Sequence, residues 1–265
     1  MIAALAFRNF RHHRAMFAAL AAGLAGFEML IIRAAAALES GPGFRAIFNL
    51  LPPAVRPVFE TQFGLVSFAS AVAFGFEHPF ALAGATAFVV VAATIPAGER
   101  ESRFLDLVLA RPLARSQYLL ASLLLLVLGA VALPLALLAG AAIGMPLVEI
   151  QGKLPWYRYI PCALGLTTLL LALGGIALLL ASGAKRRGPA ASQVVGLTLV
   201  SFVVEILADL WSGLRWVRWA SPFHYYKPIQ AAIGPSTPWE NPAILLAIFT
   251  VTTAIALARF SRRDI

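Results

Sequence analysis

The chain alternates long apolar runs with short polar segments. Six runs stand out, at about 15–38, 79–96, 119–144, 160–182, 192–210 and 242–260. An α-helix needs about 20 residues to cross a hydrocarbon core of about 30 Å, and these runs are close to that length or longer. We therefore predict an all-α polytopic membrane protein with six transmembrane helices, in which residues 1–265 form a single membrane domain.

The residues before the first run have a helical period of their own. Apolar positions share one face and basic positions the other, the first set being Ile2, Leu5, Ala6 and Phe10 and the second Arg8, Arg11, His12 and Arg14. This pattern predicts an interfacial amphipathic helix over residues 1–14, with its cations toward lipid headgroups.

A further apolar stretch, 63–76, comes before the second run. If it were a separate span, the N-terminal arginines would lie on the opposite side from the other short basic segments. Because positive charge gathers on the cytoplasmic side of short loops, we interpret 63–76 as an interfacial or re-entrant helix that leads into the span at 79–96.

Composition and charge agree with a membrane protein. The chain is 60% apolar and 12% charged, whereas soluble proteins have about 25% charged residues, so no soluble domain of useful size remains. The net charge of +9 comes mostly from short segments between spans. Thirteen basic residues fall on the side of both termini and eight on the other. We therefore expect a protein of the inner (cytoplasmic) membrane with both termini on the cytoplasmic side. Because the positive charge is explained by this orientation, we expect no nucleic-acid partner.

Motifs for catalysis and metal binding are absent from the sequence. Cys162 is the single cysteine, and the four histidines do not cluster. There is no G-x-x-x-x-G-K-[ST] phosphate loop, H-E-x-x-H or G-x-S-x-G. We expect no catalytic residue, no metal site and no cofactor bound by this chain.

A few polar or small residues inside the runs are candidates for a role. Glu28 lies in the first run, where a carboxyl needs a partner or water, and it could serve translocation or bond to a neighbouring helix. Glu205 and Asp209 share a helix face, where they could attract a cation or pair with Arg215 or Arg218 of the following loop. Gly140 and Gly144 have the spacing of a close helix contact.

The most charged segment between runs is Ala97 to Tyr118, with the sequence AGERESRFLDLVLARPLARSQY. A helix from Glu99 to Ala110 would place Phe104, Leu107, Val108 and Arg111 on one side, and Pro112 would end it. Such a helix can lie at the membrane surface and dock into a groove of a soluble partner. The alternative is a solvated connector.

This segment resembles the cytoplasmic loop of ABC-2 type (type V exporter-like) permeases. The likeness lies in Glu99-Arg100-Glu101 and in the run from Leu105 to Arg115, LDLVLARPLAR. The family pattern has Gly-Thr where this chain has Arg103 and Phe104. The resemblance extends to Ser221-Pro222-Phe223 and to Arg262-Arg263-Asp264 near the C-terminus.

The resemblance implies a permease subunit of an ABC exporter. It would act in the lipid bilayer with a second copy or a similar permease, and with two copies of an ABC ATPase subunit that bind ATP and Mg. The implied ATPase-coupling residues are Glu99, Glu101, Arg103, Phe104, Leu107, Val108, Arg111 and Arg115, and the implied outer gate is Trp219, Pro222, Phe223 and Tyr225. A non-transporting scaffold or assembly factor, or a secondary transporter, stays as the alternative.

Overall fold

The computed structural model describes residues 2–40, 52, 67–103, 115–150, 154–235 and 238–262. Within these ranges all regular structure is helical. Six helical stretches are long and apolar enough to cross a membrane, at Ala3–Ala37, Phe68–Ala93, Ser116–Leu147, Trp156–Gly183, Arg187–Ala208 and Glu240–Ser261. The predicted all-α fold is therefore confirmed.

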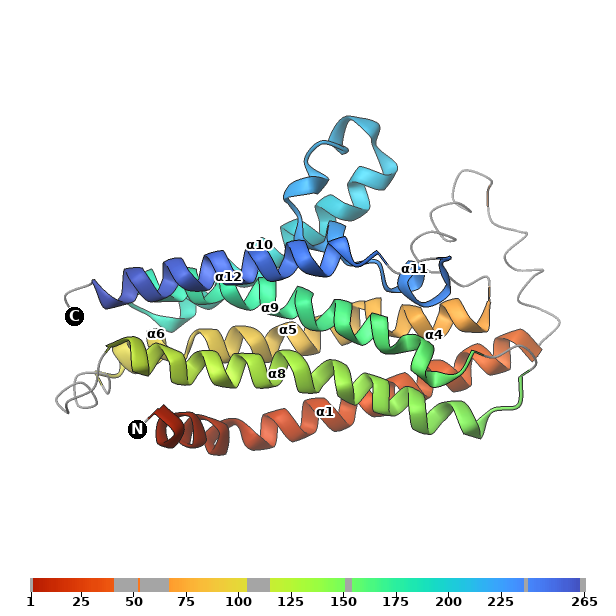
Figure 1. Ribbon diagram of the computed structural model, residues 1–265, viewed down its shortest axis with the longest axis horizontal. Coiled ribbons are helices and arrows are strands. Elements are labelled where there is room, and N and C mark those ends of the chain that lie inside the picture. Colours follow the sequence, from red (N-terminus) through yellow and green to blue (C-terminus); the bar gives the residue numbers. More distant parts are fainter. Residues whose placement is uncertain are drawn as a thin grey trace.

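The long helices lie side by side in one elongated bundle (Figure 1). They are α1 (Ile2–Ser40), α5 (Pro79–Ala93), α8 (Arg115–Gly144), α9 (Ile160–Gly183), α10 (Arg187–Leu210) and α12 (Glu240–Ser261). Shorter elements are α4 (Phe68–Glu77), α6 (Ile95–Glu101), α11 (Pro228–Ile233), η1 (Met145–Leu147), η2 (Trp156–Tyr159), η3 (Ser212–Leu214), η4 (Arg218–Ala220) and η5 (Pro222–Tyr225). The start of α1 and the end of α12 lie at the same end of the bundle, here called the terminal end, and the other is the distal end.

The expected interfacial helix and the first span form one continuous helix, α1, of 39 residues. The junction near residue 14 contains no proline or glycine, since the first glycine is Gly23. Alanine, leucine and arginine favour helix, so nothing in the sequence ends the amphipathic turns before the apolar ones begin. Residues 1–14 are therefore not a separate element.

The second pass differs from the expected span at 79–96. Helix α4 is not at the surface: Phe68, Val72 and Phe76 are buried inside the bundle, and α4 continues into α5 (Figure 1). The break between them is at His78, because Pro79 lacks an N–H and holds the preceding residue in an extended conformation. His78 then caps α5, its Nδ1 accepting from the Phe80 N–H at 3.2 Å.

Glycines permit the closest helix contacts. A Cβ on Gly140 would lie 2.4 Å from the carbonyl oxygen of Ala25, and one on Gly144 would lie 2.9 Å from Ile32. These two positions confirm the predicted close approach, here between α8 and α1. Gly175 of α9 is packed in the same way against Phe249 of α12. Because lipid is as apolar as leucine, such contacts between small residues carry much of the association of helices.

A methyl group at Gly140 should separate α1 from α8. We expect Gly140→Ala to lower the free energy of unfolding by about 1–3 kcal/mol through overpacking. The measurement is thermal or denaturant unfolding in detergent. Gly26→Ala is the control, because a Cβ there meets nothing within 4 Å. Equal stability of the two variants would contradict the packing described here.

Candidate functional site

Helix α6 joins three other helices at the terminal end. Glu99 forms an ion pair with Arg8 of α1 and accepts a hydrogen bond from the Tyr118 hydroxyl of α8. Tyr118 is buried, and the side chain of Glu99 is 20% exposed. Glu99 therefore faces the protein rather than solvent, and it connects α6 with the start of α1 and the start of α8.

Glu101 connects the same short helix with α10. Its Oε2 accepts from the backbone N–H of Arg187, the first residue of α10, at 3.0 Å. An acidic group at a helix N-terminus satisfies a free N–H and interacts favourably with the helix dipole. The Arg187 guanidinium in turn donates to Thr94 Oγ1 at 3.4 Å. The two predicted acidic residues thus bind different helices of the bundle.

The predicted helix from Glu99 to Ala110 is interrupted. Helix α6 ends at Glu101, and Ser102 and Arg103 form a turn in which Arg103 has a φ of 57°. This left-handed conformation is the one that glycine adopts without steric cost at the end of a helix. It is also the position at which the ABC-2 pattern has glycine. Because arginine at this position does not indicate such a turn, the sequence predicts a helix that continues through it.

Most of the remaining predicted coupling residues lie outside the residues that the structure describes. Phe104, Leu107, Val108 and Arg111 lie outside the described residues, and Arg115 is the first residue of α8. Their predicted role is untested.

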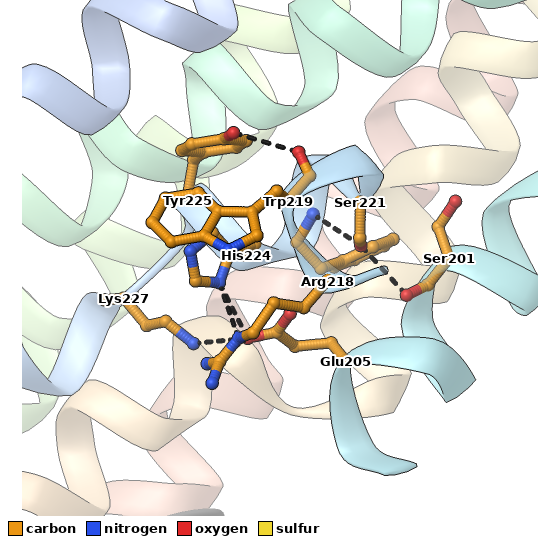
Figure 2. Close-up of polar contacts among 9 residues, drawn as sticks. Ser201, Glu205, Arg218, Trp219, Ser221, His224, Tyr225 and Lys227 are labelled. Atoms are coloured by element: carbon orange, nitrogen blue, oxygen red, sulfur yellow. Dashed lines mark hydrogen bonds and ion pairs between the residues drawn. The ribbon is translucent and has the colours of Figure 1, made fainter. Parts of the chain in front are cut away.

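Near the end of α10, three charged or titratable groups meet at the carboxylate of Glu205 (Figure 2). Glu205 Oε1 accepts from Lys227 Nζ at 2.7 Å and from Arg218 Nη2 at 3.1 Å, and His224 Nδ1 lies 3.4 Å away. The carboxylate side chain is 9% exposed. Of the two pairings that the sequence left open for Glu205, the one with Arg218 is present. The side chain of Asp209 lies outside the described part.

This cluster holds the loop after α10 against the end of that helix. Ser221 strengthens the attachment, because its hydroxyl donates to the Ser201 carbonyl at 2.9 Å and accepts from the Phe223 N–H at 3.2 Å. Phe223 packs edge-on against Phe202, with ring centroids 5.4 Å apart. Tyr225 donates to the Trp219 carbonyl at 2.9 Å. The short elements η4 and η5 are therefore fixed to α10 by polar and aromatic contacts together.

The predicted gate residues occupy different environments. Pro222 and Phe223 are buried, whereas the Trp219 side chain is 64% exposed and Tyr225 is half-buried. Trp211 and Trp216 are also exposed on the loop, which projects from the side of the bundle (Figure 1). Exposed tryptophans of this kind are typical of the boundary between lipid and water.

His224 makes this attachment sensitive to pH. Burial lowers the pKa of His224 below its ordinary value of 6.5, Glu205 opposes this shift, and Arg218 and Lys227 add to it. His224 is therefore neutral at pH 7. The rings of Trp219 and Tyr225 pack edge-on against the His224 ring, at centroid distances of 4.7 and 5.1 Å.

Sequence reasoning missed several residues of both sites. Arg8 was interpreted as facing lipid headgroups, and Tyr118, Arg187 and Lys227 were not assigned to either site. Each meets its partner across at least 19 residues of chain. No local sequence pattern predicts contacts between residues so far apart. The basic residues near each isolated acid in the sequence do indicate that the acid has a cationic partner.

The fold defines an integral membrane protein, with six apolar helical passes among the described residues. The model of the ABC-2 family transporter protein matches residues 57–265. The chain therefore belongs to the ABC-2 transporter family and is a permease component of an ABC transporter. Permeases of this family are non-catalytic transmembrane components, and membership implies association with an ABC ATPase. The chain matches no curated protein.

Removing Arg8 should release the start of α1 from α6. We expect Arg8→Ala to destabilise this contact by about 1 kcal/mol, because the pair is partly exposed and solvent screens it. Hydrogen exchange of residues 2–14 measures the release. Arg11→Ala is the matched control, since Arg11 is exposed and forms no ion pair among the described residues. Equal exchange in the two variants would count against the contact.

Acid should loosen the loop after α10. Because the pKa of His224 is lowered in the folded state, folding disfavours its protonation. The stability of the loop is therefore full above the ordinary value of 6.5 and falls as the pH drops from there toward the lower folded value. Hydrogen exchange of residues 212–227, corrected for intrinsic rates, should increase over that window.

The matched variant for this test is His224→Gln, which should remove the pH dependence. His12→Gln, on the exposed side of α1, should leave it unchanged. A slope that persists in His224→Gln would assign the effect to another group.

Proposed function

We propose that this chain is the membrane-spanning permease subunit of an ABC exporter, that it forms the translocation pathway as a dimer with a second copy or a similar permease, and that the segment 99–115 couples it to two ATPase subunits. The observation that carries the coupling is the arrangement of α6. One helix of seven residues holds α1 and α8 through Glu99 and α10 through Glu101. A displacement of the adjoining segment would therefore act on three long helices together.

The coupling step follows from this geometry. ATP and Mg would bind to the ATPase subunits, whose closure would press on Phe104, Leu107 and Val108 in a groove. Arg103, Arg111 and Arg115 would orient the contact by charge. The turn at Ser102 and Arg103 would then pass the movement to α6, and Glu99 and Glu101 would pass it to the bundle. Packed helices respond to such a push by shifting as rigid bodies between discrete arrangements.

The exposed face of α10 supports a dimer. This helix is apolar yet packs mainly on α9, and Leu199, Val200 and Val203 are exposed on it. A second permease would cover this face, and lipid would cover the remaining apolar surface.

The cluster at Glu205 would act at the outer gate. It fastens the loop that carries Trp219, Pro222, Phe223 and Tyr225 to the distal end of α10. A movement of α10, started at Glu101 at its other end, would carry this loop with it.

The positions of basic residues support one orientation in the membrane. Arg8, Arg100, Arg187 and Arg259 belong to helix segments at the terminal end, whose basic character favours the cytoplasmic side of the inner membrane. Both termini and the coupling segment would then be cytoplasmic, and the cluster at Glu205 would face outward.

A charged group in the docking surface should uncouple the complex. We expect Leu107→Asp or Phe104→Asp to reduce co-purification of the ATPase subunit at least tenfold, because a buried unpaired charge costs several kcal/mol. The measurement is affinity purification of the detergent-solubilised protein from its native host, with quantification of each subunit and an ATPase assay.

The control for this experiment is Leu147→Asp, which places the same charge at an exposed leucine of the distal end. It should retain the ATPase. Unchanged co-purification in all three variants would overturn the assignment of segment 99–115, and purification without any nucleotide-binding subunit would favour the scaffold alternative.

A further inference from the structure

Glu28 is the most anomalous polar residue of the described chain. It lies on α1 with 0% of its side chain exposed, and neither carboxyl oxygen has a hydrogen-bond partner among the described residues. Its carboxyl lies against Gly75 of α4, a helix in the distal half of the bundle (Figure 1). A buried polar group without a partner costs several kcal/mol as a charge and much less in its neutral form.

The carboxyl fits a cradle that only glycine leaves open. A Cβ on Gly75 of α4 would lie 2.1 Å from Glu28 Oε2 and 3.0 Å from Oε1. Both oxygens are therefore in contact with the backbone of α4. The break at His78 follows three residues later, so the cradle lies just before the interruption of the second pass.

Nearby titratable groups are neutral or already engaged. Tyr159, Cys162 and Tyr226 interact electrostatically with Glu28, but each donates its own hydrogen to a backbone carbonyl. The acceptors are Ala69 at 3.3 Å, Pro228 at 3.2 Å and Phe76 at 3.0 Å. Glu77 ends α4, and the His78 ring lies 4.9 Å from that of Phe27. No described cation forms an ion pair with Glu28.

The surroundings of Glu28 restrict which cation could bind to its carboxyl group. A metal cation requires several oxygen or nitrogen ligands, and the described residues contain no group of three metal-binding side chains. A proton requires one carboxylate oxygen and makes the group neutral. Among cations, the proton therefore suits a lone, fully buried carboxyl.

We propose that the interface of α1 and α4 is a proton-binding site centred on Glu28, which holds its proton while the helices are packed and exchanges it when they separate. On separation the O–H bond of the carboxylic acid breaks, the proton passes to water and the carboxylate remains in the opened interface. Return of the helices reverses the step. This site rests on contacts of the described residues and is independent of the proposed coupling at α6.

The protonation state is tested directly by infrared difference spectroscopy of the full chain in lipid nanodiscs. We expect the carbonyl band of a protonated carboxylic acid at pH 7, and its loss in Glu28→Gln. Glu149→Gln, at an exposed glutamate, is the control and should retain the band. A spectrum at pH 7 in which Glu28→Gln removes only carboxylate bands would overturn the proposal.

Proton exchange is tested by displacing the carboxyl from its cradle. We expect Gly75→Ala to weaken the acid band at pH 7, because the new methyl group occupies the place of Oε2. Gly84→Ala is the control, since its Cβ would meet Leu20 at an ordinary 3.6 Å. If Gly75→Ala does not fold, Glu28→Ala combined with Gly75→Ala should restore folding. Failure of the double variant to do so would show that Gly75 is not the cradle.

Stability against pH gives a further readout. If the packed state holds one proton more than the unfolded chain, the equilibrium constant for unfolding rises about tenfold per pH unit over the range where the two states differ. Glu28→Gln should reduce this slope by one proton, and exchange of Na⁺ for K⁺ should change nothing. Stabilisation by Na⁺ at fixed pH that Glu28→Gln abolishes would identify a metal-ion site and overturn the proton assignment.

Discussion

In a bilayer, every backbone polar group has to be satisfied within the protein, and the break at His78 shows how this chain meets that requirement. Pro79 has no N–H to donate, and the Phe80 N–H binds the His78 side chain instead of the helix. The Phe76 carbonyl thereby loses its usual donor, and the Tyr226 hydroxyl takes its place at 3.0 Å. Tyr226 stands between η5 and α11. The interruption of one pass thus fixes the loop that follows another.

Away from such breaks, the bundle depends on shape more than on polarity. Helices of leucine and alanine gain little by exchanging lipid for one another, so they associate where backbones come close. Gly140, Gly144 and Gly175 supply these points. Among the described residues, the ion pairs of Glu99 and Glu205 join separate elements of the fold. Stiff apolar helices with a few polar ties move as units, as expected of a transporter component.

Run length predicted the six passes, because about 20 apolar residues have few other uses in a chain of this composition. The distribution of basic residues was needed as well, to exclude 63–76 as a separate span. The burial of α4 was not predictable, since a ten-residue apolar helix before a proline has the same pattern at a surface as in a bundle. The position of Glu205 predicted a pairing with Arg215 or Arg218, and the pair with Arg218 is present. Lys227 and His224 were missed because η5 turns back toward α10, and a series of short 3₁₀ turns has no sequence period.

The site at α6 shows a different limit. The sequence predicts that the acids at 99 and 101 face a partner, whereas within the chain they bind Arg8, Tyr118 and the start of α10. An exposed-looking charge in a polar segment gives no hint of a cation 91 residues earlier. The left-handed turn at Arg103 was not predicted either, because glycine is the residue that indicates such a turn and this chain has arginine there.

The continuity of α1 has a mechanical consequence. Arg8 and Glu28 stand 20 residues apart on one continuous helix, which is a path of about 30 Å along the helix axis at 1.5 Å per residue. The ion pair of Arg8 and the buried Glu28 therefore belong to the same helix. If α1 slides or tilts when its contact with α6 changes, the same motion moves Glu28 toward α4 or away from it. A change at the terminal end would then reach the distal half through α1 itself.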